Sequence, residues 1–290
     1  MTTLFPVIGR TRLVKSERLS KMFDCSLYVK LELQNPTHSH KDRESRKIIE
    51  EMISQNKREA VIASTGNAAI SLAALGRSVG CKIHVFCSYT ITKERKELLK
   101  LLRAELHIVK GSYHYAVKES EAFAAERNLY LANPGNPAKR RGDMEIGEEI
   151  SEMLNKNLTV VVPTNNGTLL SGVWEGIKKA ENSDIVAATA KETRIADSIA
   201  GFHQLEGRHL KEIIQESSCE IVNVNDIEIE KAMKLLATEG IFCEPASAAS
   251  LASLEKIRVR GRNVVLIITG SAFKFAKKDL SKIFVSPRLE

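Results

Sequence analysis

The chain has 290 residues, of which 43% are hydrophobic and 27% are charged. This composition is ordinary for a globular protein with a sizeable core, and the length allows one large domain or two modest ones. The net charge of +7 leaves nucleic acid open as a partner. The most basic stretch, residues 93–103, interleaves glutamates with lysines and carries four leucines. That pattern is typical of a solvated amphipathic helix, so we expect no nucleic-acid binding.

No apolar run approaches the roughly 20 residues that span a bilayer, and residues 1–6 lack the basic start and apolar core of a signal peptide. The five cysteines are scattered and the seven histidines form no metal motif. We therefore expect a cytoplasmic protein with reduced thiols, no membrane partner and no metal.

Strand-like runs alternate with helix-like runs along the whole chain, which favours an α/β architecture with mostly parallel sheets. No repeat, low-complexity tract or linker interrupts the alternation. The runs that read as strands are residues 27–33, 60–63, 82–87, 106–109, 159–162, 185–190, 219–224 and 263–269.

One lysine, Lys41, lies where a polar turn meets the start of a predicted helix, within the segment 35–43 (NPTHSHKDR). Residues 42–52 repeat apolar side chains with a helical period. A lysine that such a junction holds rigidly and partly desolvates can act as a nucleophile toward an aldehyde. A solvated lysine in a first helical turn is the alternative that this segment alone leaves open.

Three further segments, residues 60–69, 159–168 and 264–271, each have the form of a strand, a polar glycine-bearing turn and a helix start. In an open α/β sheet, such turns line the crevice at the carboxyl ends of the strands, where ligands bind. Each turn alone is a weak signal. Together with the lysine segment, in this order, they predict a binding site.

These residues resemble the fold-type II pyridoxal-phosphate enzymes, and within them threonine synthase and its relatives. Members carry N-P-T-G-S-x-K-D-R, S-x-G-N-x-A and E-P-A-S-A-A segments, which match residues 35–43, 64–69 and 244–249. The resemblance begins near Ile8 and covers nearly the whole chain. It implies two three-layer α/β/α domains of the tryptophan synthase β type and a homodimer. A larger cofactor-binding domain would comprise residues 1–44 and 140–290, and a smaller, mobile substrate-binding domain residues 45–139.

The resemblance also implies site residues for pyridoxal 5'-phosphate. Lys41 would be the covalent anchor and the base that removes the substrate's α-proton. The hydroxyl of Thr269 would give the pyridine nitrogen a neutral hydrogen bond, which suits elimination or replacement. The phosphate would lie at a helix N-terminus, which binds anions through N–H groups and the helix dipole. That phosphate cradle would be formed by Thr164, Asn165, Asn166, Gly167 and Thr168.

The substrate carboxylate would be held by Ser64, Thr65, Gly66 and Asn67, and Asn67 would also bond the cofactor's phenolic oxygen. Simpler roles stay open for all of these residues. The 64–67 turn could merely cap a helix, the 164–168 turn could be a plain capping turn, and Thr269 could be a strand-end residue with a satisfied hydroxyl.

Departures from the family pattern concern specificity. Glycine is usual at the positions of His38, Glu44 and Asn165, and a histidine–glycine pair is usual at Ser271-Ala272. Asparagine tolerates left-handed backbone angles, so the cradle could survive at residue 165. Cations for an anionic leaving group would come from Arg43, Lys139, Arg140 and Arg141, of which the last three read as solvated.

The sequence therefore predicts a pyridoxal-phosphate-dependent lyase of threonine biosynthesis that converts O-phosphohomoserine to threonine and phosphate. Serine or threonine dehydration and cysteine-synthase-like β-replacement stay open as alternatives within the family. A non-catalytic binding protein with the same fold is the alternative from another class.

Overall fold

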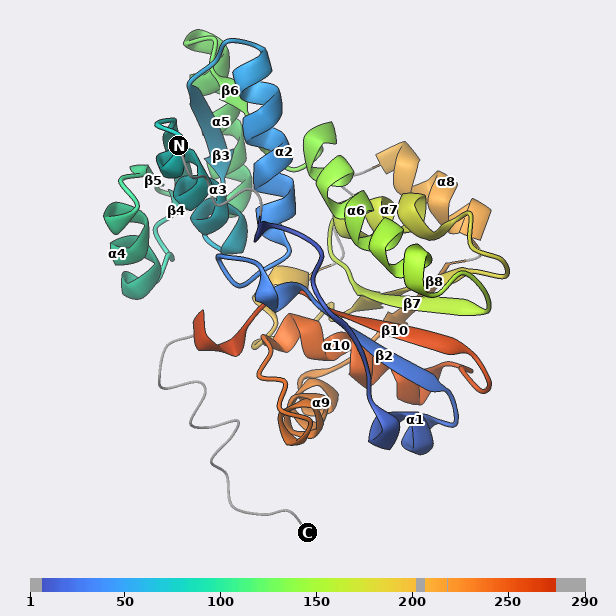
Figure 1. The fold of residues 1–290 in the computed structure, drawn as a ribbon. Coiled ribbons are helices and arrows are strands. Elements are labelled where there is room, and N and C mark those ends of the chain that lie inside the picture. Colours follow the sequence, from blue (N-terminus) through green and yellow to red (C-terminus); the bar gives the residue numbers. More distant parts are fainter. Residues whose placement is uncertain (1–6, 202–206, 218, 275–290) are drawn as a thin grey trace. The chain divides into compact units, whose positions relative to one another are not determined.

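The computed structural model describes residues 7–201, 207–217 and 219–274. Contacts divide the chain into two compact units (Figure 1). The first unit comprises residues 1–9 and 35–143, and the second comprises residues 10–34 and 144–290. Residues 1–6, on which the absence of a signal peptide was argued, lie outside the described residues. Across the described ranges, no helix combines the length and apolarity that a bilayer crossing needs.

The first unit is built on a four-stranded parallel sheet in the order β5-β4-β3-β6. Its strands are β3 (Glu59–Ala63), β4 (Lys82–Ser88), β5 (Glu105–Val109) and β6 (Tyr130–Leu131). Helices α2 (Lys41–Ser54), α3 (Asn67–Ser78) and α4 (Lys93–Leu101) pack on one face. Helix α5 (Tyr113–Glu126) packs on the other face, so this unit has three layers.

The second unit is built on a six-stranded sheet in the order β1-β2-β10-β7-β8-β9, in which only β1 runs antiparallel to its neighbour. Its strands are β1 (Leu13–Lys15), β2 (Ser26–Leu31), β7 (Leu158–Pro163), β8 (Asp184–Thr189), β9 (Glu220–Asn223) and β10 (Asn263–Ile268). Helices α1 (Glu17–Phe23), α9 (Asp226–Thr238) and α10 (Pro245–Ser253) cover one face. The other face packs against α7 (Thr168–Ile177), α8 (Gly207–Ser217) and the end of α6 (Pro137–Met153).

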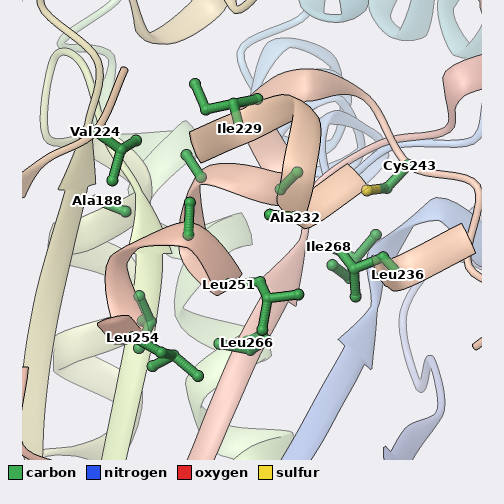
Figure 2. Packing of buried hydrophobic residues seen from close by; sticks show 14 of the residues in the cluster. Ala188, Val224, Ile229, Ala232, Leu236, Cys243, Leu251, Leu254, Leu266 and Ile268 are labelled. Atoms are coloured by element: carbon green, nitrogen blue, oxygen red, sulfur yellow. The ribbon is translucent and has the colours of Figure 1, made fainter. Parts of the chain in front are cut away.

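Strand β10 shows why the central strands are almost continuously apolar. Successive side chains of a strand point to opposite faces. Val265 and Ile267 accordingly pack with α6, α7 and α8, while Leu266 and Ile268 pack with α9 and α10 (Figure 2). A strand that is buried on both faces must be hydrophobic throughout, as parallel sheets covered by helices require.

The predicted architecture of two three-layer α/β/α domains with mostly parallel sheets is confirmed. The run 27–33 is too long as a strand, because β2 ends at Leu31 and residues Glu32–Gln34 form a 3-10 turn. Strands β1 and β6 were not predicted, since three and two residues are too short to show alternation. The contact division places residues 35–44 in the first unit. A boundary at residue 44 would cut the continuous helix α2.

Candidate functional site

Lys41, the predicted cofactor anchor, is the first residue of α2. Its side chain is 24% exposed, and its Nζ donates a hydrogen bond to Oε1 of Glu44, one helical turn further along. Residues three apart on a helix lie on the same face, which brings these two side chains together. The amine is therefore half-buried and held by a carboxylate.

Asp42 explains how the chain enters this helix. Its carboxylate accepts hydrogen bonds from the backbone N–H of Thr37, at 2.7 Å, and from the hydroxyl of Ser71 on α3, at 2.6 Å. The preceding turn closes with the N–H of His38 bonded to the carbonyl of Asn35, at 2.7 Å. His38 has a φ of 60°, so it adopts left-handed angles at the position where the family usually has glycine.

The cations suggested for an anionic leaving group occupy different environments. Lys139 was expected to be solvated, but it is buried, and its Nζ lies 3.8 Å from Oε2 of Glu44. Arg43 is fully buried. Arg141 is exposed and pairs with Glu51. Of the three residues expected to be solvated, Arg140 is half-buried and Arg141 alone is exposed.

The turn 64–66 follows β3 and leads into α3 at Asn67. Gly66 is the N-cap residue of α3, and no side chain provides a capping hydrogen bond there. The Ser64 hydroxyl instead accepts from the N–H of Gly66, at 3.2 Å. A Cβ built at Gly66 would meet nothing within 4 Å, so this side of the turn is open. An open helix start without a side-chain cap is suited to binding a carboxylate.

Asn133 holds the base of that turn. Its Oδ1 accepts from the N–H of Ala63, at 2.7 Å, and its Nδ2 donates to Ser120 on α5, at 2.8 Å. Asn133 therefore fixes the end of β3. Sequence reasoning assigned this residue no role.

An open pocket of about 520 Å³ lies at the carboxyl ends of β4 and β5 in the first unit. None of its lining residues carries a formal charge at neutral pH, and most carry a hydroxyl. The lining consists of Thr65, Ser88, Tyr89, Thr90, Gly111, Ser112 and Tyr113. Burial raises the pKa of Tyr113, and the charge of Lys41 opposes that rise. Thr65, from the predicted carboxylate turn, therefore lines the same pocket as Tyr113, whose pKa responds to the charge of Lys41.

The predicted phosphate cradle lies in the second unit, where β7 turns into α7. Thr164 uses both of its donors inside this unit: its N–H bonds to the carbonyl of Ala188, at 2.8 Å, and its hydroxyl to that of Val162, at 2.9 Å. The left-handed backbone lies at Gly167, with a φ of 91°, and not at Asn165. The turn therefore does not draw on the conformational tolerance for which Asn165 was singled out.

The first turn of α7 has the features of an anion site. It contains no acidic residue, and its N-cap residue is Gly167, which has no side chain that could cap the helix. Asn166 shapes it by accepting from the N–H of Thr168, at 3.1 Å. Such a helix start favours a phosphate through its N–H groups and its dipole.

Thr269 follows β10 in the second unit and is 3% exposed. Its hydroxyl donates to Oε1 of Glu244, at 2.7 Å, and lies 2.8 Å from the Ser247 hydroxyl. Ser247 also accepts from the N–H of Gly270, at 3.2 Å. The E-P-A-S-A-A segment therefore orients the Thr269 hydroxyl. These contacts satisfy that hydroxyl within the second unit, so the simpler role of Thr269 as a strand-end residue stays open.

The structure also brings together residues that the sequence spacing did not associate. His40, Glu44 and Asp143 are buried, and their ligand atoms lie within 4.8 Å of one another, which is the only such group among the described residues. The ammonium groups of Lys41 and Lys139 already lie beside Glu44. Another cation would add positive charge there, so we assign no metal to this cluster.

Comparisons with known proteins fit this geometry. A family model described as pyridoxal-phosphate dependent enzyme matches residues 4–270. Threonine synthase from Methanocaldococcus jannaschii is 32% identical over 92% of this chain and 75% of its own length. Threonine synthase from Halalkalibacterium halodurans is 29% identical over 96% of this chain and 86% of its own length.

Among solved structures, isoform 2 of threonine deaminase from Solanum lycopersicum superimposes with a TM-score of 0.84 at 20% identity. The match covers 97% of this chain and 84% of that one, and it shows a shared fold. The half-buried amine of Lys41 suits an aldehyde, and the helix starts at Asn67 and Thr168 suit a carboxylate and a phosphate. The chain belongs to the fold-type II pyridoxal-phosphate dependent enzymes, so it is a lyase whose cofactor is pyridoxal 5'-phosphate.

Proposed function

We propose that this enzyme converts O-phosphohomoserine to threonine and phosphate. The observation that carries the proposal is the similarity to two proteins named threonine synthase, which extends over at least 92% of this chain. The Lys41 segment and the 64–67 turn, which the family uses for chemistry, are both present in this chain.

The first unit would supply the reactive groups. Lys41 would carry the cofactor and then, as a neutral amine, take the α-proton of the substrate. Ser64, Thr65 and Gly66 would hold the substrate carboxylate with hydroxyl and N–H groups. Asn67 would contribute to that site and also bond the cofactor's phenolic oxygen.

The second unit would supply the binding groups for the rest of the cofactor. The turn from Asn165 to Thr168, which leads into α7, would hold the phosphate, with Thr164 fixing the turn. Thr269 would offer the ring nitrogen a neutral partner by turning its one hydroxyl proton from Glu244 to that nitrogen. When bound, pyridoxal phosphate supplies the sink for the electrons that the departing α-proton leaves behind.

Dehydration of threonine or serine is the second candidate, and one observation favours it. The pocket beside Thr65 is lined by hydroxyl groups, without a lysine or arginine side chain. A neutral hydroxyl leaving group would find hydrogen-bond partners there, whereas a phosphate dianion would lack a cation within that lining.

The test is a panel assay of the cofactor-loaded protein with O-phosphohomoserine, threonine, serine and O-acetylserine. Equal amounts of threonine and inorganic phosphate from O-phosphohomoserine would support the first proposal. Formation of 2-oxobutanoate from threonine, without phosphate release from O-phosphohomoserine, would make the chain a dehydratase. Turnover of none of the four, by a protein that holds the cofactor, would favour the binding-protein alternative.

We also propose that substrate binding orders the smaller, mobile substrate-binding domain, and that the enzyme acts as a cytoplasmic homodimer. The carboxylate turn on the first unit motivates the first point, because binding there would couple ordering to exclusion of water. Free cysteines throughout the described residues fit a reducing compartment. Hydrogen exchange with and without a substrate analogue would test the ordering, and identical protection in residues 45–139 would contradict it.

A further inference from the structure

Glu44 is the most unusual residue near the cofactor lysine. It stands where threonine synthases commonly have glycine, and its side chain is almost completely buried, with 2% exposed. Its Oε1 accepts the hydrogen bond from Lys41 Nζ. Burying an unpaired carboxylate costs several kcal/mol of folding free energy. The charged groups that surround Glu44 must therefore compensate its burial.

The partners of Glu44 come from two helices of the first unit. At the start of α2 they are Lys41 and the N-cap residue His40, whose Nε2 lies 3.8 Å from Oε1. On α6 the ammonium of Lys139 lies 3.8 Å from Oε2. The carboxylate of Asp143, also on α6, lies in the same buried cluster.

These charges decide the ionisation of Glu44. Burial alone would raise the pKa of this carboxyl group. The positive charges of Lys41, Lys139 and His40 outweigh burial and lower the pKa to about 2. Glu44 is therefore a carboxylate at neutral pH.

We propose that Glu44 is a positioning residue for Lys41, whose carboxylate acts as the fixed counter-ion of the Lys41 ammonium. The inference rests on the proposed role of Lys41. Whenever Nζ carries a proton, Glu44 stabilises it and holds the nitrogen at the start of α2. When the amine takes the α-proton, the C–H electron pair stays with the substrate and its cofactor, the proton stays on Nζ, and Glu44 remains ionised.

A purely structural role for Glu44 would have a different signature. In that role, the carboxylate would only join α2 to α6 through Lys139, and its removal would lower stability without changing the proton affinity of Lys41. As a counter-ion, the carboxylate must shift the pH at which Lys41 becomes a neutral, reactive amine. An opposite charge at this distance moves such a midpoint by about 1–3 pH units.

The experiment measures that midpoint in cofactor-free protein. The initial rate at which pyridoxal phosphate and cyanoborohydride label Lys41 would be followed by peptide mass spectrometry from pH 6 to about pH 11, since an ordinary lysine titrates at about pH 10.4. We expect Glu44→Gln to move the midpoint down by about 1–3 pH units. The matched control is Glu50→Gln on the same helix, because Glu50 is exposed and contacts Arg46 and Lys47. The control should keep the parent midpoint.

Two further variants cover a failure of Glu44→Gln to fold. Glu44→Asp keeps the charge and should keep a midpoint close to that of the parent. The double variant Glu44→Gln with Lys139→Gln removes one charge of each sign, so it leaves less uncompensated charge, and its midpoint should lie below that of Lys139→Gln alone, because loss of the Lys139 charge by itself raises the midpoint. Equal midpoints in the parent and Glu44→Gln, or in Lys139→Gln and the double variant, would overturn the counter-ion role while leaving Lys41 as the anchor. Labelling of another lysine in place of Lys41 would instead overturn the proposed function, and this inference with it.

Discussion

The start of α2 in the first unit and the end of β10 in the second each orient one side chain that we assign to the cofactor, but by different forces. Lys41 is held by the ionised Glu44, within a buried group of opposite charges. Thr269 is held by hydrogen bonds to Glu244 and Ser247. The first arrangement controls a proton affinity, and the second fixes a hydroxyl direction.

This difference indicates how strongly a substitution in each region should affect the protein's stability. Charges that are buried together are costly to separate, since removing one leaves its partner uncompensated. A hydroxyl bonded to two neighbours can lose one bond for about 0.5–1.5 kcal/mol. Substitutions in the first region should therefore have larger consequences than equivalent substitutions in the second.

Lys41→Ala should have the largest effect on activity. The variant loses both the covalent anchor and the base, and general-base catalysis alone contributes about 10²–10⁴-fold. We expect turnover to fall by at least about 10³-fold and borohydride to fix no cofactor on the protein. Lys47→Ala is the control, because Lys47 lies on the same helix and pairs with exposed Glu50. A Lys41→Ala protein that still carried borohydride-fixed cofactor would contradict the assignment of Lys41 as the covalent anchor.

Two glycines compare the packing of the two regions. A Cβ at Gly142 on α6 would come within 2.6 Å of the backbone carbonyl of Arg43, whereas one at Gly270 would come within 2.7 Å of the Glu244 carboxylate. Backbone cannot move aside as a side chain can. We expect Gly142→Ala to cost about 2–3 kcal/mol and Gly270→Ala about 1–2 kcal/mol.

Denaturant unfolding of both variants would measure this order, with Glu148→Ala as the control at an exposed position of α6. The gain of about 1 kcal/mol that alanine brings to a helix offsets only part of the Gly142 clash. Gly142→Ala at parental stability would show that α2 and α6 are less closely packed than the glycine indicates.

The sequence predicted the parts of the fold and site that depend on neighbouring residues. Short apolar runs gave the central strands, and glycine-bearing turns gave the starts of α3 and α7. The Glu44 cluster was not predicted, because Lys139 is 95 residues away in sequence (139 minus 44) and charge in a helix normally reads as solvated. The contact between Thr269 and Glu244 was missed for the same reason, although both residues lie in recognised motifs.

Thr269→Val should produce a moderate effect. Valine keeps the volume of threonine but leaves the Glu244 and Ser247 groups without this partner in a buried site, which costs about 1–3 kcal/mol of stability. Activity should fall by about 2- to 10-fold, because one neutral hydrogen bond contributes about 0.5–1.5 kcal/mol. Thr269→Ser keeps the hydroxyl and should retain most activity. Equal activity in the Val and Ser variants would remove Thr269 from the site.

The smallest effect concerns pH and a histidine pair in the first unit. His84 contacts Glu59 through Nε2, at 2.8 Å, and His107 through Nδ1, at 3.2 Å. The His107 ring stacks on Phe86 with their centroids 4.4 Å apart. Burial lowers the pKa of His107, and the charge of His84 adds to this effect.

The sign of the effect follows from that pKa. Because the folded-state pKa of His107 lies below the ordinary value of 6.5, the unfolded chain binds more protons as the pH falls through 6.5. His107 therefore stabilises the fold above this pH, and the stabilisation is lost on acidification. The pKa of Glu59 is also lowered, chiefly by its hydrogen bond with His84, but from 4.5, so its contribution is lost only below pH 4.5. The interval from pH 7.5 to 5.5 thus isolates the histidine effect.

In the described part of the second unit, the carboxyl group with a shifted pKa is Glu228, which also titrates below pH 4.5. Between pH 7.5 and 5.5, protection from hydrogen exchange, corrected for the intrinsic rate, should therefore fall more in β4 and β5 than in β10. His107→Gln should remove most of that difference, while His114→Gln, at an exposed position of α5, should leave it intact. A fall of equal size in both units, or one that survives His107→Gln, would mean that the acid sensitivity arises elsewhere than in the contact between His84 and His107.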